Sequence, residues 1–168
     1  DKGDTGEKGE DGRGISKMEI VNGELIVTYT DGTNDNLGAI GSDSSEDNTV
    51  LIFTLLDNDT YSVSAGNGAK KVNSIEIPST YNGKAVTQIA DRAFYRLSNL
   101  TTITVPDSVI SIGEYAFYEC NFLSDVTLPN SLQSIKKYAF SRCTSITKIT
   151  IPSSTTYIGE YAFYDSSL

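Results

Sequence analysis

The chain has 168 residues, enough for one or two domains, and a formal net charge of −9. This acidic balance argues against nucleic-acid binding, because phosphates require a basic surface. No apolar run approaches the ~20 residues of a transmembrane helix. The absence of histidine removes serine–histidine and cysteine–histidine nucleophiles and most zinc sites. We therefore expect no enzyme, cofactor, metal site or membrane span.

Residues 1–14 read DKGDTGEKGEDGRG and carry glycine at every third position. Only glycine fits at the crowded axis of a collagen triple helix. The spacing predicts the end of a collagen-like stalk, and a flexible charged leader is the alternative.

Residues 15–40 carry two short-hairpin turn signals, Asn22-Gly23 and Asp31-Gly32, around the alternating segment ELIVTYT. This pattern predicts a three-stranded β-meander. Such a small sheet is marginally stable alone, and apolar residues occur on both of its faces. The segment resembles those that follow collagen-like stretches in bacterial and phage surface fibres. We expect a trimer junction, with a homotrimer formed through residues 1–40; a hairpin packed against the first repeat is the alternative.

Residues 41–49 have the composition of a linker. Residues 50–72 then predict two strands around the turn Asp57-Asn58-Asp59. We expect this hairpin to cap the N-terminal edge of the fold that follows, because an open edge recruits other chains. Turn chemistry explains the Asp-Asn-Asp cluster without a calcium ion.

Residues 73–168 repeat with a period of 23 residues, shown by Phe94, Phe117, Phe140 and Phe163. Strand-like segments end at Pro78, Pro106, Pro129 and Pro152, and the first unit carries five extra residues. A fixed period of this kind indicates a solenoid. The last unit is incomplete, which we read as the mark of a fragment of a longer chain.

Within one unit the side chains alternate, so that Ile103 and Val105 point inward and Thr104 points outward. Four such strands predict a parallel ladder, which each proline ends. Ala116, Phe117 and Cys120 follow at the spacing of one helical turn. We therefore expect an α/β solenoid in which short parallel strands alternate with short helical turns.

The segments LTTITVPDSVISIGEYAFYECNFL (100–123) and LSDVTLPNSLQSIKKYAFSRCTSI (123–146) resemble the BspA-type leucine-rich repeat of bacterial surface proteins. The first unit departs from that pattern by an insertion at 81–85 and by Leu97 in place of cysteine. The resemblance implies extracellular display and a protein-binding or adhesive role. It implies no catalytic residue.

Cys120 and Cys143 occupy one position of adjacent units. The ~4.8 Å spacing of neighbouring strands does not exclude a disulfide. The same position holds Leu97 and Ser166 in the other units, which favours free buried thiols that belong, with the four phenylalanines, to the core.

The candidate binding residues form three repeated sets. Tyrosine offers rigid contact area with a polar tip, and threonine suits an exposed strand face. The first set is Tyr115, Tyr138 and Tyr161, the second is Tyr95, Tyr118 and Tyr164, and the third is Thr104, Thr127 and Thr150. The sequence does not choose between the tyrosine and threonine faces, and the tyrosines also fit a purely shielding role.

These observations predict an extracellular binding or adhesion module of a bacterial cell surface, secreted or displayed. Its partner is a host or matrix protein or a glycan. The alternative is a passive spacer or fibre module without a ligand.

Overall fold

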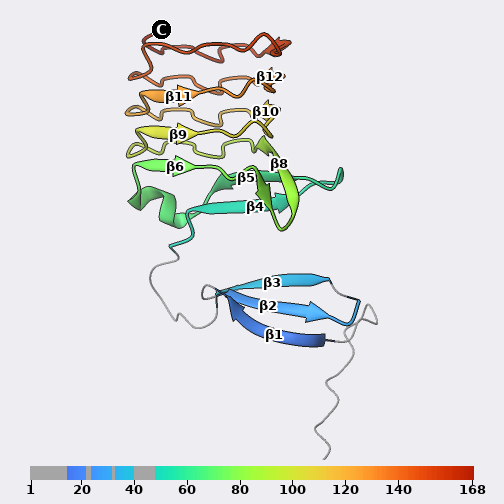
Figure 1. Cartoon of the computed structure of the whole chain (residues 1–168). Helices are drawn as coiled ribbons and strands as arrows, with labels where there is room; N and C mark the ends of the chain where they lie inside the picture. Colours follow the sequence, from blue (N-terminus) through green and yellow to red (C-terminus); the bar gives the residue numbers. More distant parts are fainter. Residues whose placement is uncertain (1–14, 22–23, 32, 40–47) are drawn as a thin grey trace, which may run out of the picture. The chain divides into compact units, whose positions relative to one another are not determined.

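The computed structural model describes residues 15–21, 24–31, 33–39 and 48–168 (Figure 1). The chain divides into two compact units, Asp1–Glu46 and Asp47–Leu168. The collagen-like prediction for residues 1–14 and most of the linker predicted at 41–49 lie outside the described residues.

The first unit contains an antiparallel sheet in the order β1-β2-β3. Its strands are β1 (Ile15–Val21), β2 (Glu24–Tyr29) and β3 (Asn34–Ala39). The carboxylate of Asp31 accepts hydrogen bonds from the backbone N–H and the hydroxyl of Thr33, at 2.9 and 2.6 Å. This short-range bonding fixes the turn that leads into β3.

The second unit is a solenoid whose chain passes through the same path four times (Figure 1). We name the passes coil 1 (73–100), coil 2 (101–123), coil 3 (124–146) and coil 4 (147–168). A first parallel ladder joins β6 (Ser74–Glu76), β9 (Thr102–Thr104) and β11 (Asp125–Thr127). Paired residues of β9 and β11 are one repeat apart, as in Ile103 with Val126, which confirms the predicted parallel ladder for three of the four units.

A second ladder lines another side of the coils, and the sequence did not reveal it. It joins β8 (Lys84–Ile89), β10 (Ser111–Ile112), β12 (Ser134–Ile135) and β13 (Tyr157–Ile158) in parallel. The strands β10, β12 and β13 are two residues long, too short to give an alternating pattern. Ile112, Ile135 and Ile158, which lie five residues before successive phenylalanines, belong to this sheet.

The N-terminal end of this sheet is an antiparallel hairpin of β4 (Leu51–Leu55) and β5 (Tyr61–Ala65). β5 pairs in parallel with β8, so β4 forms the edge. The insertion of coil 1 folds as a second hairpin, in which β7 (Thr80–Tyr81) pairs with β8. Its turn residues Asn82 and Gly83 have φ angles of 47° and 75°, which is why an Asn-Gly pair suits this position.

The phenylalanine column is the centre of the core. Phe94, Phe117 and Phe140 are fully buried, and Phe163 is partly buried in the last coil. Successive rings stack with centroids 5.2, 4.9 and 5.5 Å apart. Each coil therefore covers the aromatic face of the next, and no coil buries its apolar side chains alone.

The prediction of helical turns is wrong, and the solenoid is almost entirely sheet and turn. The segments around the four phenylalanines are turns, and the one helix of the described chain is the 3₁₀ helix η1 (Asn67–Lys71). The N–H groups of Phe94, Phe117 and Phe140 donate to Ala116, Ala139 and Ala162 in the following coil, each at 2.7 Å. A helix would direct these donors back along its own axis, so the α/β class does not apply.

The strand predicted in coil 4 is also absent. Residues 148–151 form no strand, and the first ladder ends at β11. The second ladder continues into coil 4 through β13. Coil 4 is therefore paired with coil 3 on one side and open on the other.

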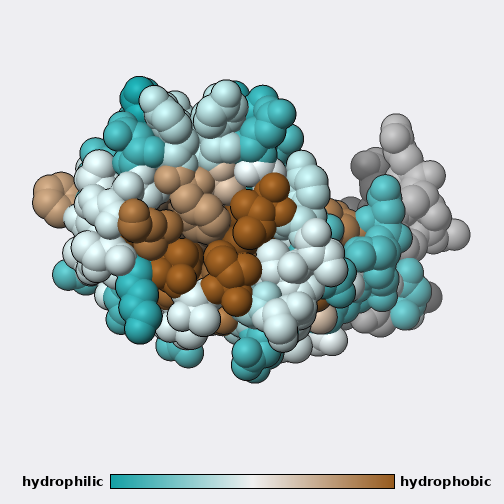
Figure 2. Space-filling view, turned by 90° about the horizontal axis from the view of Figure 1, so that it is seen from above, coloured by the Kyte–Doolittle hydropathy of each residue, from teal (hydrophilic) through white to brown (hydrophobic). Residues whose placement is uncertain are grey.

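Figure 2 looks at the solenoid from the end where the C-terminus lies and shows an apolar area with polar surroundings. The exposed apolar residues of coil 4 include Ile151, Ile158 and Leu168. Within the described residues, no helix is long and apolar enough to cross a membrane.

Candidate binding surfaces of the solenoid

Two tyrosine columns run along the turns that carry the buried phenylalanines. In the first column Tyr115, Tyr138 and Tyr161 stack with ring centroids 4.9 and 5.1 Å apart. In the second column Tyr95 and Tyr118 stack at 5.3 Å. The second column is interrupted in coil 3 by Ser141, which is buried, and its hydroxyl has no hydrogen-bond partner. The six tyrosines are partly or well exposed.

The stacking decides what these tyrosines can offer to a partner. Ring faces within a column cover one another, and basic side chains lie near the rings as well. The cation-to-centroid distances are 5.7 Å for Arg92 and Tyr115, 5.5 Å for Lys137 and Tyr138, and 5.8 Å for Arg142 and Tyr118. The columns therefore present ring edges and hydroxyl groups rather than open aromatic faces.

A column of alternating charge lies beside the second tyrosine column. It consists of Arg96, Glu119, Arg142 and Asp165, one residue from each coil. Glu119 accepts hydrogen bonds from Arg96 at 2.7 Å and from Arg142 at 2.9 Å, and Asp165 lies 3.7 Å from Arg142. The Arg142 hydrogen bond contributes most to lowering the pKa of Glu119. All four residues have positive φ angles of 57° or 58°, so this column also marks the tight bend of each turn.

The sequence analysis missed the charged column, although its signal was present: opposite charges alternate at the repeat spacing. Through these contacts every charged side chain of the column has an oppositely charged partner within the solenoid. The whole solenoid unit is close to neutral, because eleven acidic and nine basic residues follow Glu46, whereas eleven acidic and four basic residues precede Asp47.

The threonine face lies on the first ladder. Thr104 and Thr127 are register partners on β9 and β11, and both are exposed, as are Glu76 below them and Thr150 in coil 4. Thr104 and Thr127 lie in strands, whereas the tyrosines of both columns lie in the turns around the phenylalanines. The two predicted contact surfaces are therefore separate features of the coil.

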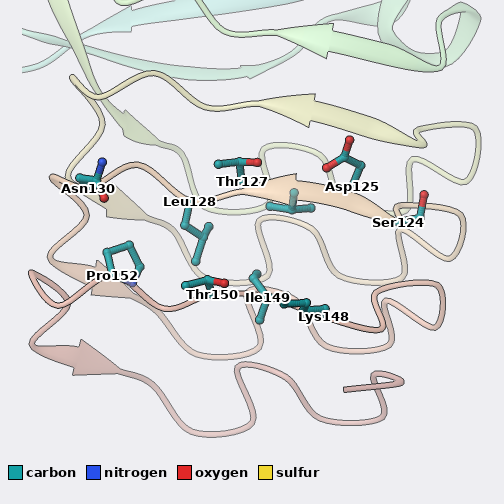
Figure 3. A pocket seen from close by; sticks show the side chains of 10 residues that line it. Ser124, Asp125, Thr127, Leu128, Asn130, Lys148, Ile149, Thr150 and Pro152 are labelled. Carbon is teal, nitrogen blue, oxygen red and sulfur yellow. The ribbon is translucent and has the colours of Figure 1, made fainter.

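A hollow of about 500 Å³ opens on the threonine face between coils 3 and 4. Figure 3 shows its side chains on two neighbouring segments, with Asp125, Thr127 and Leu128 on one and Lys148, Thr150 and Pro152 on the other. The hollow also includes Ser124, Val126, Asn130 and Ile149. The hollow could not be predicted from the sequence, because the segment KITIP in coil 4 fits a strand as well as DVTLP in coil 3 does.

Cys120 and Cys143 are buried free thiols. Each S–H donates to a carbonyl of the preceding coil, Cys120 to Phe94 and Cys143 to Phe117, both at 3.0 Å. The hydroxyl of Ser166 makes the same bond to Phe140, at 3.0 Å. The position therefore carries a hydrogen-bond donor between coils. Burial raises the pKa of Cys120 well above its ordinary value and that of Cys143 to about 12, so neither thiol serves as a nucleophile.

The Asp57-Asn58-Asp59 turn is held by contacts within the protein. The side chain of Asn58 accepts a 2.7 Å hydrogen bond from the Thr60 hydroxyl, and Asp59 forms an ion pair with Lys84. Across the described part of the chain, no group of three histidine, cysteine, aspartate or glutamate side chains is placed to hold a metal ion.

Comparison with known proteins agrees with this architecture. A family model described as the BspA type leucine rich repeat region matches residues 64–168 in six copies. Among curated proteins, no match was found.

Three solved structures illustrate the likeness. A leucine-rich repeat protein of T. pallidum is 29% identical with a TM-score of 0.63, and the match covers 69% of this chain and 54% of that one. A leucine-rich repeat protein of Bacteroides capillosus is 35% identical with a TM-score of 0.60, over 66% of this chain and 83% of that one. The pneumococcal vaccine antigen PcpA shares the fold at 19% identity and a TM-score of 0.57, over 89% of this chain and 30% of that one. The present chain thus spans about half of the T. pallidum protein, and it belongs to the BspA-type leucine-rich repeat family.

Proposed function

We propose that this chain is a non-catalytic binding module, displayed outside a bacterial cell, that contacts a protein or glycan of a host or matrix through a repeat face. The resemblance of its repeats to those of bacterial surface proteins supports the location. The solenoid supports the mode of action, because stacked coils repeat one contact group at a fixed interval along an extended surface.

The observation that carries the proposal is the first tyrosine column. Tyr115, Tyr138 and Tyr161 repeat a hydroxyl group in three successive coils, with rings held about 5 Å apart by stacking. Coil 1 has Arg92 in this position, so the fold of a coil does not require tyrosine there. A preorganised row of hydroxyl groups loses little conformational entropy when it binds a partner.

The test separates hydroxyl contacts from stacking. Tyr115, Tyr138 and Tyr161 are replaced together by phenylalanine, which keeps the stack and removes the hydroxyl groups. Binding of labelled protein is measured on epithelial cells and on arrays of matrix proteins and glycans. We expect the variant to keep its melting temperature and to bind at least tenfold more weakly. Unchanged binding by the folded variant would remove this column as the contact surface.

A passive spacer is the second candidate, and it is favoured by the ion pairs within the charged column. The ion pairs of Glu119 with Arg96 and Arg142 hold successive coils together without a ligand. The same cell and array assay decides between the two candidates, because a spacer binds nothing above the level of an unrelated solenoid of similar charge.

The front unit is proposed to multiply the binding by forming a homotrimer through residues 1–40. Ile15 and Met18 of β1 are 53% and 63% exposed, and exposed apolar side chains on a small sheet favour association. Sedimentation equilibrium of residues 1–168 beside residues 50–168 tests this arrangement. A trimer of the long form and a monomer of the short form support avidity through the stalk; two monomers contradict it.

A further inference from the structure

We propose that the hollow between coils 3 and 4 binds an extended peptide segment, which joins the first ladder as a strand on the open edge of β11. This inference rests on the proposed binding function and deepens it by naming one site and one class of ligand. It concerns the threonine face and is independent of the tyrosine columns.

The lower coils show how the edge of a strand is normally satisfied in this ladder. The carbonyl of Asn73 in coil 1 accepts from the N–H groups of Thr101 and Thr102 in coil 2, at 2.8 and 3.2 Å. The N–H of Ile77 donates to the carbonyl of Thr104 at 3.0 Å. The carbonyl of Thr101 in turn accepts from Ser124 at 3.0 Å. The carbonyl contact thus repeats from coil 1 to coil 2 at the same repeat position.

In coil 3 the corresponding groups have no partner in coil 4. By repeat position they are the carbonyl of Ser124, the N–H and carbonyl of Val126, and the N–H of Leu128, since alternate residues of a parallel strand direct both backbone groups to the same neighbour. Within the described solenoid, no backbone hydrogen bond joins residues 124–128 to residues 147–151. An unpaired strand edge is a template for another strand.

The opening is confined to this side of the coil. Coil 4 remains attached through β13, which pairs with β12. It also remains attached through the turns, where Phe140 donates to Ala162 and Arg142 to Tyr164, both at 2.7 Å. The hollow is therefore a side opening between two coils that are held together elsewhere, rather than a detached end of the chain.

The chemistry of the walls fits a peptide better than a sugar. Val126, Leu128, Ile149 and Pro152 supply apolar surface, and about 500 Å³ lies within the usual range of ligand sites. None of the lining residues is aromatic, so no flat ring is available for a sugar to stack on. Asp125 and Lys148 line the hollow from neighbouring coils and form no ion pair with each other.

The sequence of the repeat suggests which peptide to use as the probe for this site. The upper edge of β9 binds the segment 125–127 of the next coil, so the upper edge of β11 should accept the same kind of strand. We therefore choose a fluorescein-labelled peptide with the sequence SDVTLPNS, which copies residues 124–131. Its control carries N-methyl groups on the aspartate and threonine amides, because Asp125 donates to coil 2 in the ladder and Thr127 lies in the same alternation. These groups remove the donors of an added strand and keep every side chain.

The chain-side variant closes the hollow with a disulfide. In a Cys120→Ser/Cys143→Ser background, Thr127→Cys and Thr150→Cys tie coil 4 to coil 3 at the spacing of neighbouring strands. The matched control, in the same background, is Ser74→Cys with Thr102→Cys, which links register partners of β6 and β9 outside the hollow. Fluorescence polarisation then measures peptide binding to each protein, oxidised and reduced.

We expect saturable binding to the parent chain, a loss of at least tenfold in the oxidised closed variant, recovery on reduction, and no loss in the control variant. The N-methylated peptide should bind at least tenfold more weakly, a result that does not depend on forming the disulfide. No saturable binding, equal binding by the two peptides, or equal binding by the closed and open variants overturns the inference. The triple tyrosine-to-phenylalanine variant should bind the peptide normally, so failure of the tyrosine surface and failure of this site are distinguished.

Discussion

The two buried thiols predict a specific loss of stability at alkaline pH. Burial raises the pKa of Cys143 to about 12 from an ordinary value of 9.0, and that of Cys120 also lies far above 9.0. The unfolded chain releases these protons near pH 9, whereas the folded chain keeps them. Their contribution to stability is therefore fully present below pH 9 and is lost as the pH rises from 9 toward 12.

The magnitude follows from proton linkage. Above the unfolded pKa each thiol costs about 1.4 kcal/mol of unfolding free energy per pH unit. At pH 10 the two thiols together cost roughly 3 kcal/mol relative to pH 7, a large fraction of the stability of a domain. Tyrosine and lysine side chains also titrate at this pH, so the thiol contribution has to be isolated by a matched variant.

The matched variant is Cys120→Ser/Cys143→Ser. Serine already occupies this position in coil 4, where Ser166 donates to Phe140, so the hydrogen bond between coils is retained while the titration is removed. Urea unfolding of both proteins is followed by circular dichroism at pH 7 and pH 10 under reducing conditions. We expect the parent to lose about 3 kcal/mol more than the variant between the two pH values. Equal losses would refute the argument that these thiols stay protonated inside the fold.

The remaining predictions concern the core, the close approach between coils and the charged column. Phe117→Ala should lower the unfolding free energy by about 3–5 kcal/mol, and Phe163→Ala by less, because Phe163 stacks on one ring only and is partly exposed; urea unfolding measures both. Gly113→Ala should lower the melting temperature, because the added Cβ would lie 2.5–2.6 Å from backbone atoms of the coil below, whereas Ser153→Ala on the exposed surface of coil 4 should not. Arg142 holds the pKa of Glu119 below its ordinary value. The Glu119 carboxylate therefore stabilises the fold at pH values above that ordinary pKa, and this stabilisation is lost as the pH falls through the folded-state pKa. Glu119→Gln should therefore reduce the fall in melting temperature on acidification, measured by thermal unfolding at several pH values.

The repeat and the first ladder could be predicted from sequence because several constraints agree. Ile103 and Val105 alternate with Thr104, a proline follows, and the same pattern returns after 23 residues. A strand of this kind buries one face and stacks on its copy in the next unit. The structure places Ile103 and Val105 in the core and Thr104 on the surface.

The turns could not be predicted from one unit, because their conformation depends on the neighbouring coil. Ala116, Phe117 and Cys120 have a spacing that fits a helical turn, and all three are buried. The same burial is achieved by a turn with left-handed residues at Tyr115 and Glu119, whose φ angles are 55° and 57°. Alternate N–H groups of that turn are satisfied by the next coil, and this partner is invisible in a pattern of apolar residues.

The charged column shows why one repeat position holds different residue types in successive coils, although its backbone conformation is the same in each coil. Like charges stacked at the ~4.8 Å spacing of neighbouring strands would repel. Arg96, Glu119, Arg142 and Asp165 avoid this by alternating in sign, so each charge has a partner of opposite sign in an adjacent coil. Each charge of this column is therefore balanced within the solenoid. On the threonine face Asp125 and Lys148 also occupy one repeat position with opposite signs, yet they form no ion pair with each other. The threonine face thus carries two charges that are not paired with each other, beside the edge of β11 to which coil 4 makes no backbone hydrogen bond.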